Sequence, residues 1–293
     1  MKILAVYFAV FAFAVAETPI RELETGLIGA GGMRIPEYRH GYLVGYNGVG
    51  PFHGFTTHAP NGVLAVQKYI DTYPSIGDVE IDRDGSIIVG VSNGMLLFDP
   101  TGKQIGFIDT GRFVPSHINS APDHSIWVFG WQRDQFLNGA AASDYMMLRQ
   151  YSRSGNLEKS FLPRTLFPAG LEPGGSSGDI KLHVTKDRIG MAATSGKSGD
   201  SREWLELDFS GNVLKRLHLD PIVRGPLSVA FTEDNHAYVQ SAGAGPIFTV
   251  DESGKAWKLV ANHKGSLMGA DGNSLVYRNN NTSIVRLQWY AQP

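Results

Sequence analysis

Two short turn signatures alternate along this chain, and they restrict its possible folds more than any other feature. The first is a polar turn followed by a β-rich strand, as in residues 82–89 (DRDGSIIV) and 122–128 (PDHSIWV). Weaker copies of this first signature occupy residues 38–44, 185–189, 233–239 and 271–276. The second is an apolar strand ending in a polar turn with a glycine, at residues 98–102 (FDPTG), 151–155, 207–211 and 250–254.

Each signature has a physical cause. Asp-Gly and Ser-Gly supply the positive φ that tight hairpins need, and the flanking Ile, Val, Trp and Tyr suit pleated strands. The two signatures alternate from residue 82 to residue 254, so one repeat is strand, tight turn, strand, variable loop, strand, tight turn, strand. A four-stranded sheet cannot bury both faces alone, so such units are expected to pack side by side around an axis.

The number of repeats predicts the architecture. The first signature occurs near residues 42, 87, 126, 189, 237 and 275. Six repeats over residues 17–293 average about 46 residues each, a length typical of propeller blades. The last repeat lacks a fourth strand after residues 284–289, and residues 20–25 alternate apolar and polar with no other sheet to join. We therefore predict an all-β, six-bladed β-propeller, closed by the N-terminal strand joining the last blade. Two separate sandwiches are the alternative, and they would not use that pairing.

On these motifs the chain resembles NHL-type and related six-bladed propellers, in which a D-x-D-G-x-I/L-x-V strand precedes a strand ending F-D-x-x-G. The resemblance is clearest at residues 76–111 and 225–254, and long insertions at 45–62 and 130–147 blur it. It implies a scaffold and no particular activity, because this architecture hosts binding modules, hydrolases, lyases and structural parts.

The first sixteen residues are expected to be a secretory signal peptide. Lys2 precedes an apolar run over residues 3–15, and residues 14–16 form an A-x-A cleavage site before Glu17. The alternative is a membrane anchor, but about 13 apolar residues fall short of the roughly 20 that cross a bilayer. We expect cleavage after Ala16, a single propeller domain over residues 17–293, and a secreted or periplasmic location.

The amino-acid composition restricts the classes of partner that this chain is expected to bind. The chain has no cysteine, which excludes disulfides and thiolate metal sites. Its net charge is −2 and basic residues are interspersed with acidic ones, so no nucleic-acid stripe and no basic membrane-binding helix is expected. We expect a monomer with no membrane span, whose partner is a protein, a peptide or a carbohydrate.

One side of the propeller is expected to carry the long connections, at residues 45–62, 130–146, 162–178 and 194–203. Recognition residues usually concentrate in such loops, and aromatic side chains beside Arg and His suit sugar or peptide binding. The candidate ligand-binding residues are Tyr46, Phe52, His53, His58, Trp131, Arg133, Asp134, Phe136 and Tyr145. The alternative for each is packing against neighbouring loops.

The innermost strands offer a second candidate site. Asp78, His117 and Asp179 each fall near the start of one of these strands, and carboxylate and imidazole groups suit Ca²⁺ or another divalent metal. Lactonases and an amidating lyase with related propellers use such an axial ion, although their ligand sets cannot be matched here residue by residue. The alternative is that the two aspartates cap backbone N–H groups and His117 lines a watery channel.

No catalytic motif is present, so no residue is assigned a catalytic role and enzymatic activity stays open. The sequence favours an exported binding or scaffolding module that acts through its loop-rich face. The rival hypothesis is a metal-dependent hydrolase, lactonase or lyase with its site at the axial mouth.

Overall fold

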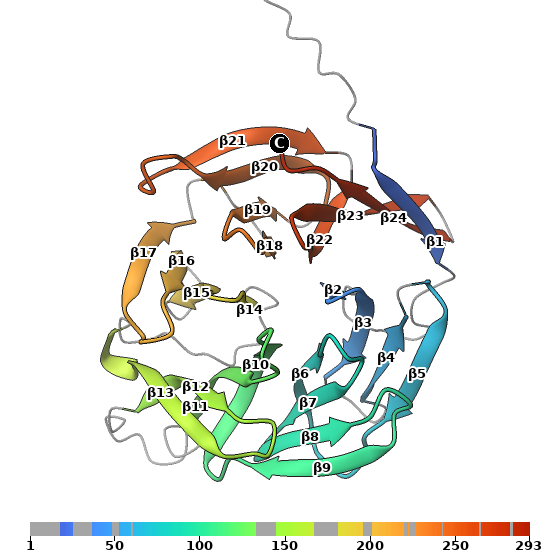
Figure 1. Ribbon diagram of the computed structural model, residues 1–293, viewed down its shortest axis with the longest axis vertical. Helices are drawn as coiled ribbons and strands as arrows, with labels where there is room; N and C mark the ends of the chain where they lie inside the picture. Colours follow the sequence, from blue (N-terminus) through green and yellow to red (C-terminus); the bar gives the residue numbers. More distant parts are fainter. Residues whose placement is uncertain are drawn as a thin grey trace, which may run out of the picture.

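The computed structural model is a ring of six four-stranded antiparallel sheets around a central axis (Figure 1). It describes residues 18–25, 37–48, 53–59, 61–132, 145–166, 181–195, 201–219, 222, 227–241, 243–263, 265–281 and 284–293. Within each sheet the strands follow the chain from the axis to the rim, except in the last sheet. The predicted six-bladed propeller is confirmed.

The first three blades follow one another along the chain. Blade 1 contains β2 (Glu37–Arg39), β3 (Tyr42–Asn47), β4 (Gly54–His58) and β5 (Leu64–Tyr69). Blade 2 contains β6 (Ile76–Ile81), β7 (Ile87–Val91), β8 (Gly94–Phe98) and β9 (Gln104–Asp109). Blade 3 contains β10 (Phe113–Ser120), β11 (Ile126–Gln132), β12 (Met146–Tyr151) and β13 (Leu157–Pro163), followed by the 3₁₀ turn η1 (Arg164–Leu166).

The remaining blades complete the ring. Blade 4 contains β14 (Lys181–Val184), β15 (Ile189–Ser195), β16 (Ser201–Leu207) and β17 (Val213–His218). Blade 5 contains β18 (Leu227–Phe231), β19 (Ala237–Ser241), β20 (Gly245–Val250) and β21 (Trp257–His263). Blade 6 contains β22 (Ser266–Asp271), β23 (Ser274–Asn281) and β24 (Ile284–Tyr290), with β1 (Arg21–Thr25) as its outermost strand.

The two turn signatures form the hairpins that the sequence predicted. The Gly102 amide donates to the Asp99 carbonyl at 2.9 Å, and the glycine holds φ at 80°. That left-handed backbone favours glycine, which explains its place three residues after the aspartate. These turns join the first to the second and the third to the fourth strand of a blade, so they lie on one side of the ring. We call this side the hairpin face and the opposite side the loop face.

One of the expected long insertions contains parts of two paired strands. Residues 45–62 were predicted to be a loop, but β3 and β4 pair across them from Leu43 with His58 to Asn47 with Gly54. Gly54 in turn permits the pairing of β4 with β5, since an added Cβ there would lie 2.3 Å from the Lys68 carbonyl oxygen. The insertion is therefore an extended hairpin.

Apolar side chains fill each interface between neighbouring blades. Between blades 1 and 2, the Phe55 and Phe98 rings pack with centroids 5.6 Å apart and are fully buried. Between blades 3 and 4, the buried Trp127 ring of blade 3 packs on Phe209 of blade 4, with ring centroids 5.1 Å apart. Comparable clusters fill the other four interfaces. Hydrophobic burial therefore joins each blade to its two neighbours.

The N-terminal strand closes the ring as predicted. β1 pairs antiparallel with β24, from Arg21 opposite Trp289 to Thr25 opposite Val285. Leu23 packs against the cluster that joins blades 6 and 1. This pairing brings the two ends of the described chain into one sheet (Figure 1). No helix within the described residues has the length and apolarity that crossing a bilayer needs.

We predict that Leu23→Asp destabilises the protein by about 1–3 kcal/mol, because it places a carboxylate against the blade 6–1 cluster. Leu64→Asp is the matched control, since Leu64 is half exposed on the outer strand of blade 1. Urea denaturation of both variants measures the difference. Equal stability of the two variants would contradict ring closure through β1.

Candidate functional site

The innermost strands present charged side chains to the propeller axis. In β2 the buried Tyr38 packs between blades 6 and 1, while Glu37 and Arg39 flank it and face inward. The same alternation places Asp78 and Glu80 of β6 beside the axis. This follows from strand geometry, because successive side chains point to opposite faces.

Arg39 is the centre of this axial group. Its Nη1 donates to Glu80 Oε2 at 2.6 Å and to the Ile118 carbonyl oxygen at 2.9 Å. Its Nη2 donates to Glu37 Oε2 at 2.6 Å and to Asp78 Oδ1 at 3.2 Å. One guanidinium thus joins three carboxylates of blades 1 and 2 to the backbone of blade 3.

The axial group also crosses the ring. The Lys181 ammonium of β14 forms an ion pair with Glu37 of β2. Blades 1 and 4 face each other across the axis (Figure 1), so this pair spans the central channel. We call Glu37, Arg39, Asp78, Glu80 and Lys181 the axial charge network.

Burial and Arg39 act in opposite directions on the carboxylates of this network. Burial raises the pKa of Asp78 to about 6, although Arg39 opposes that rise. Burial also favours a higher pKa for Glu37, but Lys181 and Arg39 outweigh it and hold that pKa below its usual range. For Glu80 too, Arg39 and His40 outweigh burial, so its pKa is lowered. Asp78 is therefore the member that most readily takes up a proton.

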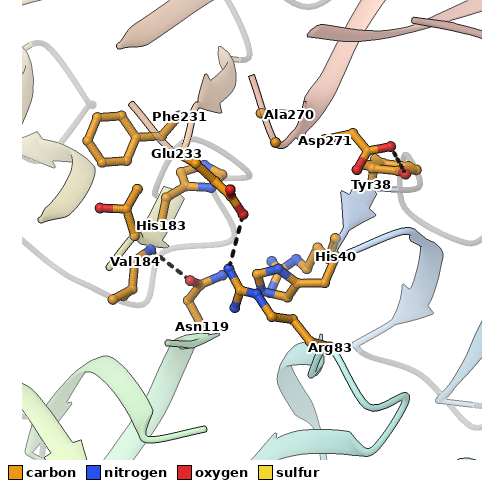
Figure 2. A pocket seen from close by; sticks show the side chains of 13 residues that line it. Tyr38, His40, Arg83, Asn119, His183, Val184, Phe231, Glu233, Ala270 and Asp271 are labelled. Atoms are coloured by element: carbon orange, nitrogen blue, oxygen red, sulfur yellow. Dashed lines mark hydrogen bonds and ion pairs between the residues drawn. The ribbon is translucent and has the colours of Figure 1, made fainter. Parts of the chain in front are cut away.

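A cavity of about 210 Å³ lies on the axis between the first-strand hairpins, at the hairpin face (Figure 2). Arg39 contributes to its wall, so the axial charge network borders it. The lining residues are Tyr38, Arg39, His40, Arg83, Asn119, His183, Val184, Thr185, Phe231, Glu233, Ala270, Asp271 and Gly272. They come from all six blades, so the cavity is a product of the closed ring.

Several of the lining groups have their hydrogen bonds filled. The Tyr38 hydroxyl donates to Asp271 Oδ2 at 2.8 Å, and Trp289 Nε1 donates to the same oxygen at 2.9 Å. The Val184 amide donates to Asn119 Oδ1 at 2.7 Å. His40 has a φ of 48° in the tight turn after β2, and its Nε2 lies 3.1 Å from Glu80 Oε1.

Three buried polar atoms at the cavity have no hydrogen-bond partner among the described residues. They are His40 Nε2, which lies beside the Glu80 carboxylate, Arg83 Nη1 and His183 Nε2. Burial, helped by the nearby Arg39, lowers the pKa of His183 to about 4, so the imidazole is neutral at pH 7. A buried polar group without a partner costs about 1–3 kcal/mol, so Arg83 Nη1 and His183 Nε2 are suited to receive a ligand.

A loose ion pair crosses the same cavity. Arg83 Nη2 lies 3.8 Å from Glu233 Oε1, and Figure 2 shows the two side chains meeting over the cavity. The Glu233 side chain is 64% exposed, and that of Arg83 29%. An exposed pair at this distance contributes about 0–1 kcal/mol, so it separates at little cost.

The candidate ligand-binding residues do not line this cavity. Tyr46 packs on the blade 1–2 cluster and donates its hydroxyl to the Gly77 carbonyl at 3.1 Å, and His53 and His58 are buried in blade 1. Tyr145 is buried in the blade 3–4 cluster, and Trp131 packs against it. Their binding role stays a prediction. Phe52, Arg133, Asp134 and Phe136 lie outside the described residues.

The candidate metal ligands are placed only in part. Asp78 accepts hydrogen bonds from the amides of Val79 and Ile118 at 2.9 and 2.8 Å, in addition to its contacts with Arg39. His117 lies in β10, and Asp179 lies outside the described residues. The metal site therefore stays a prediction.

Another group of potential metal ligands lies on the hairpin face. Among the described residues, Asp82, Asp84 and His124 bring their ligand atoms within 4.8 Å of one another. Arg153 donates to Asp82 Oδ2 at 3.1 Å and lies 2.8 Å from Asp84 Oδ2. The Arg153 guanidinium therefore already supplies the positive charge that this group requires.

Comparison with known proteins supports the fold alone. No family model and no curated protein matches the sequence of this chain. The chain is similar in structure to a luciferin-regenerating enzyme, with 10% identity and a TM-score of 0.54 over 94% of this chain and 98% of that one. It is similar to a putative gluconolactonase, with 12% identity and a TM-score of 0.52 over 94% and 96%. It is also similar to the WD40 domain of Toxoplasma gondii coronin, with 11% identity and a TM-score of 0.51 over 94% and 85%.

The sequence contained a signal for the axial charge network that the motif analysis did not use. Charged and apolar residues alternate in the first strands as Glu-Tyr-Arg at 37–39, Asp-Val-Glu at 78–80 and Lys-Leu-His at 181–183. A charge at every second position of an innermost strand faces the axis. The alternating pattern could not predict that Arg39 pairs with Asp78. The two residues lie in different blades, and the pattern does not say how one blade is rotated relative to the next.

We predict that Arg39→Met destabilises the protein by about 3–5 kcal/mol, because it leaves buried carboxylates without their shared cation. Arg83→Met is the matched control and should cost less than about 1 kcal/mol, since among the described residues the Arg83 side chain forms only the loose ion pair with Glu233. Chemical denaturation at neutral pH measures both. Similar losses from the two substitutions would contradict a central role for Arg39.

Proposed function

We propose that this protein is an exported binding module that holds a small polar ligand in the axial cavity. The observation that carries the proposal is the pair of buried, unpartnered polar atoms, Arg83 Nη1 and His183 Nε2, at a cavity of about 210 Å³. Ligand sites combine a concave wall with a few polar groups that fix orientation. Here Phe231, Val184 and Ala270 supply apolar surface beside those groups.

Binding is favoured over catalysis because the buried acids of the axial charge network are already engaged. Glu80 is fully buried and is bonded by Arg39, and Asp78 shares the same guanidinium. A general acid or base must reach the substrate proton directly or through one water. The Asp78 and Glu80 carboxylates are bonded to Arg39, and the Arg39 guanidinium therefore occupies the position from which they would contact a substrate.

The loop face is the other possible location of a binding site. A protein, peptide or carbohydrate partner at that face stays part of the proposal as its second location. The described aromatic residues there, Tyr46, Trp131 and Tyr145, pack against blade cores. The hairpin face therefore has the stronger support.

Export is supported by the N-terminal pattern of Lys2, an apolar run and the Ala-Val-Ala site before Glu17. Residues 1–17 lie outside the described part of the chain. The absence of cysteine agrees with a bacterial periplasm or exterior as a general expectation.

A metal-dependent hydrolase, lactonase or lyase is the second candidate. In its favour, two proteins of similar fold are a luciferin-regenerating enzyme and a putative gluconolactonase. At 10% and 12% identity this similarity concerns the fold alone. The Asp78 carboxylate, which would be a ligand, is already balanced by Arg39.

Ala270→Leu should abolish ligand binding, because Ala270 lines the cavity and the larger side chain occupies it. Ala256→Leu, in the exposed turn of blade 5, is the matched control. Thermal shifts with sugars, polyols, hydroxy acids, amines and amino acids at millimolar concentration provide the measurement. At least one compound should stabilise the native chain and the Ala256 variant, but not the Ala270 variant.

Two results would contradict the proposed site. Either no compound stabilises the native chain, or a stabilising compound acts equally on the Ala270 variant. In the second case the ligand binds elsewhere, and the loop face becomes the first alternative.

A further inference from the structure

The lining of the axial cavity carries equal numbers of positive and negative side chains, which indicates the chemical class of ligand that the cavity can bind. Its lining contains two cations, Arg39 and Arg83, and two carboxylates, Glu233 and Asp271. The remaining titratable groups that line it are Tyr38, His40 and His183. Asp271 is bonded by Tyr38 and Trp289, and Arg39 is bonded within the axial charge network. Arg83 and Glu233 are therefore the charged lining residues most open to a ligand.

These two residues reach the cavity from opposite sides. Arg83 follows β6 in blade 2 and Glu233 follows β18 in blade 5, and Figure 2 shows their charged ends directed toward one another. Their backbones are fixed: the Arg83 amide donates to Asp82 Oδ1 at 2.7 Å, and the Glu233 amide donates to the Gly272 carbonyl at 3.2 Å. Only their side chains need to separate for a molecule to enter between them.

A small zwitterion would replace one loose ion pair with two closer ones. The ligand carboxylate would pair with the Arg83 guanidinium, which can bind a carboxylate through two parallel N–H groups. The ligand ammonium would pair with the Glu233 carboxylate. A simple anion would leave Glu233 beside it without a cation, and a simple cation would do the same to Arg83.

Further contacts favour a ligand with a carboxylate on this side of the cavity. His183 Nε2, which has no partner among the described residues, can donate to a second carboxylate oxygen as a neutral imidazole. Asn119 Nδ2 is 3.5 Å from both Glu80 oxygens, so its amide protons are only weakly engaged. The cavity of about 210 Å³ is smaller than the roughly 300–1,000 Å³ that drug-sized ligands occupy.

We infer that the axial cavity binds a small zwitterion of the α-amino acid type, clamped between Arg83 and Glu233. This inference rests on the proposed function, since it concerns the same cavity, and it adds the chemical class of the ligand. The carboxylate lies on Arg83 and His183, and the ammonium lies on Glu233. The ligand side chain faces Phe231, Val184 and Ala270.

The test is calorimetric titration of the whole exported chain with glycine, L-alanine, L-serine and L-valine. The matched probes are propionate, which lacks the ammonium of alanine, and ethylamine, which lacks its carboxylate. At least one amino acid should bind at least ten-fold more tightly than both probes. Arg83→Met and Glu233→Gln should each weaken that binding about ten-fold or more.

Arg112→Met and Glu252→Gln are the control variants, since both residues lie in exposed turns away from the cavity lining. They should bind as the native chain does. The fold of each variant is checked by its thermal melting, which neither Arg83→Met nor Glu233→Gln should change much.

Three outcomes would overturn the inference, and they differ in what they leave standing. Propionate binding as tightly as the amino acids identifies a simple anion site, which leaves the proposed function intact. If a sugar or polyol binds in the cavity and no amino acid does, the inference is likewise overturned and the proposed function is left intact. If neither these probes nor any compound in the wider panel binds in the cavity, the proposed function falls together with this inference.

Discussion

The structure depends on one buried cation, Arg39, that holds three carboxylates beside the propeller axis. Its contacts with Glu37, Asp78 and Glu80 join blades 1 and 2, and its bond to the Ile118 carbonyl adds blade 3. Lys181 extends the network to blade 4 on the opposite side. Bare carboxylates would be costly at so buried a position, so the network is stable only while both cations are present.

Apolar packing and the axial charge network perform different tasks. The interblade clusters join each blade to its neighbours, and they act only between adjacent sheets. The pair of Glu37 with Lys181 connects sheets that share no such interface. By placing charged groups across the channel, the network borders the axial cavity. Arg39, which lines the cavity at the hairpin face, therefore belongs to the same network that connects opposite blades.

Local chemistry explains how far the sequence predicted this molecule. The glycine turns, such as the one ending at Gly102, and the strands beside them depend on neighbouring residues, so blade number and ring closure were predictable. The cavity was not, because Arg83 and Glu233 are 150 positions apart in the chain and meet only after the ring closes. From the sequence alone, Arg83 and Glu233 each look like an ordinary solvated charge in a turn. Asp78 was placed beside the axis correctly, but its partner Arg39 lies in another blade and no motif links the two.

The most direct test of this account is a double-mutant cycle on the pair that spans the ring. Glu37→Gln, Lys181→Met and the double variant are compared with the native chain by chemical denaturation. The account predicts a coupling energy of at least about 1 kcal/mol, because Glu37 and Lys181 contact each other directly and either single substitution removes that same contact. Additivity of the two single effects within about 0.3–0.5 kcal/mol would show that the pair acts independently and would contradict the account.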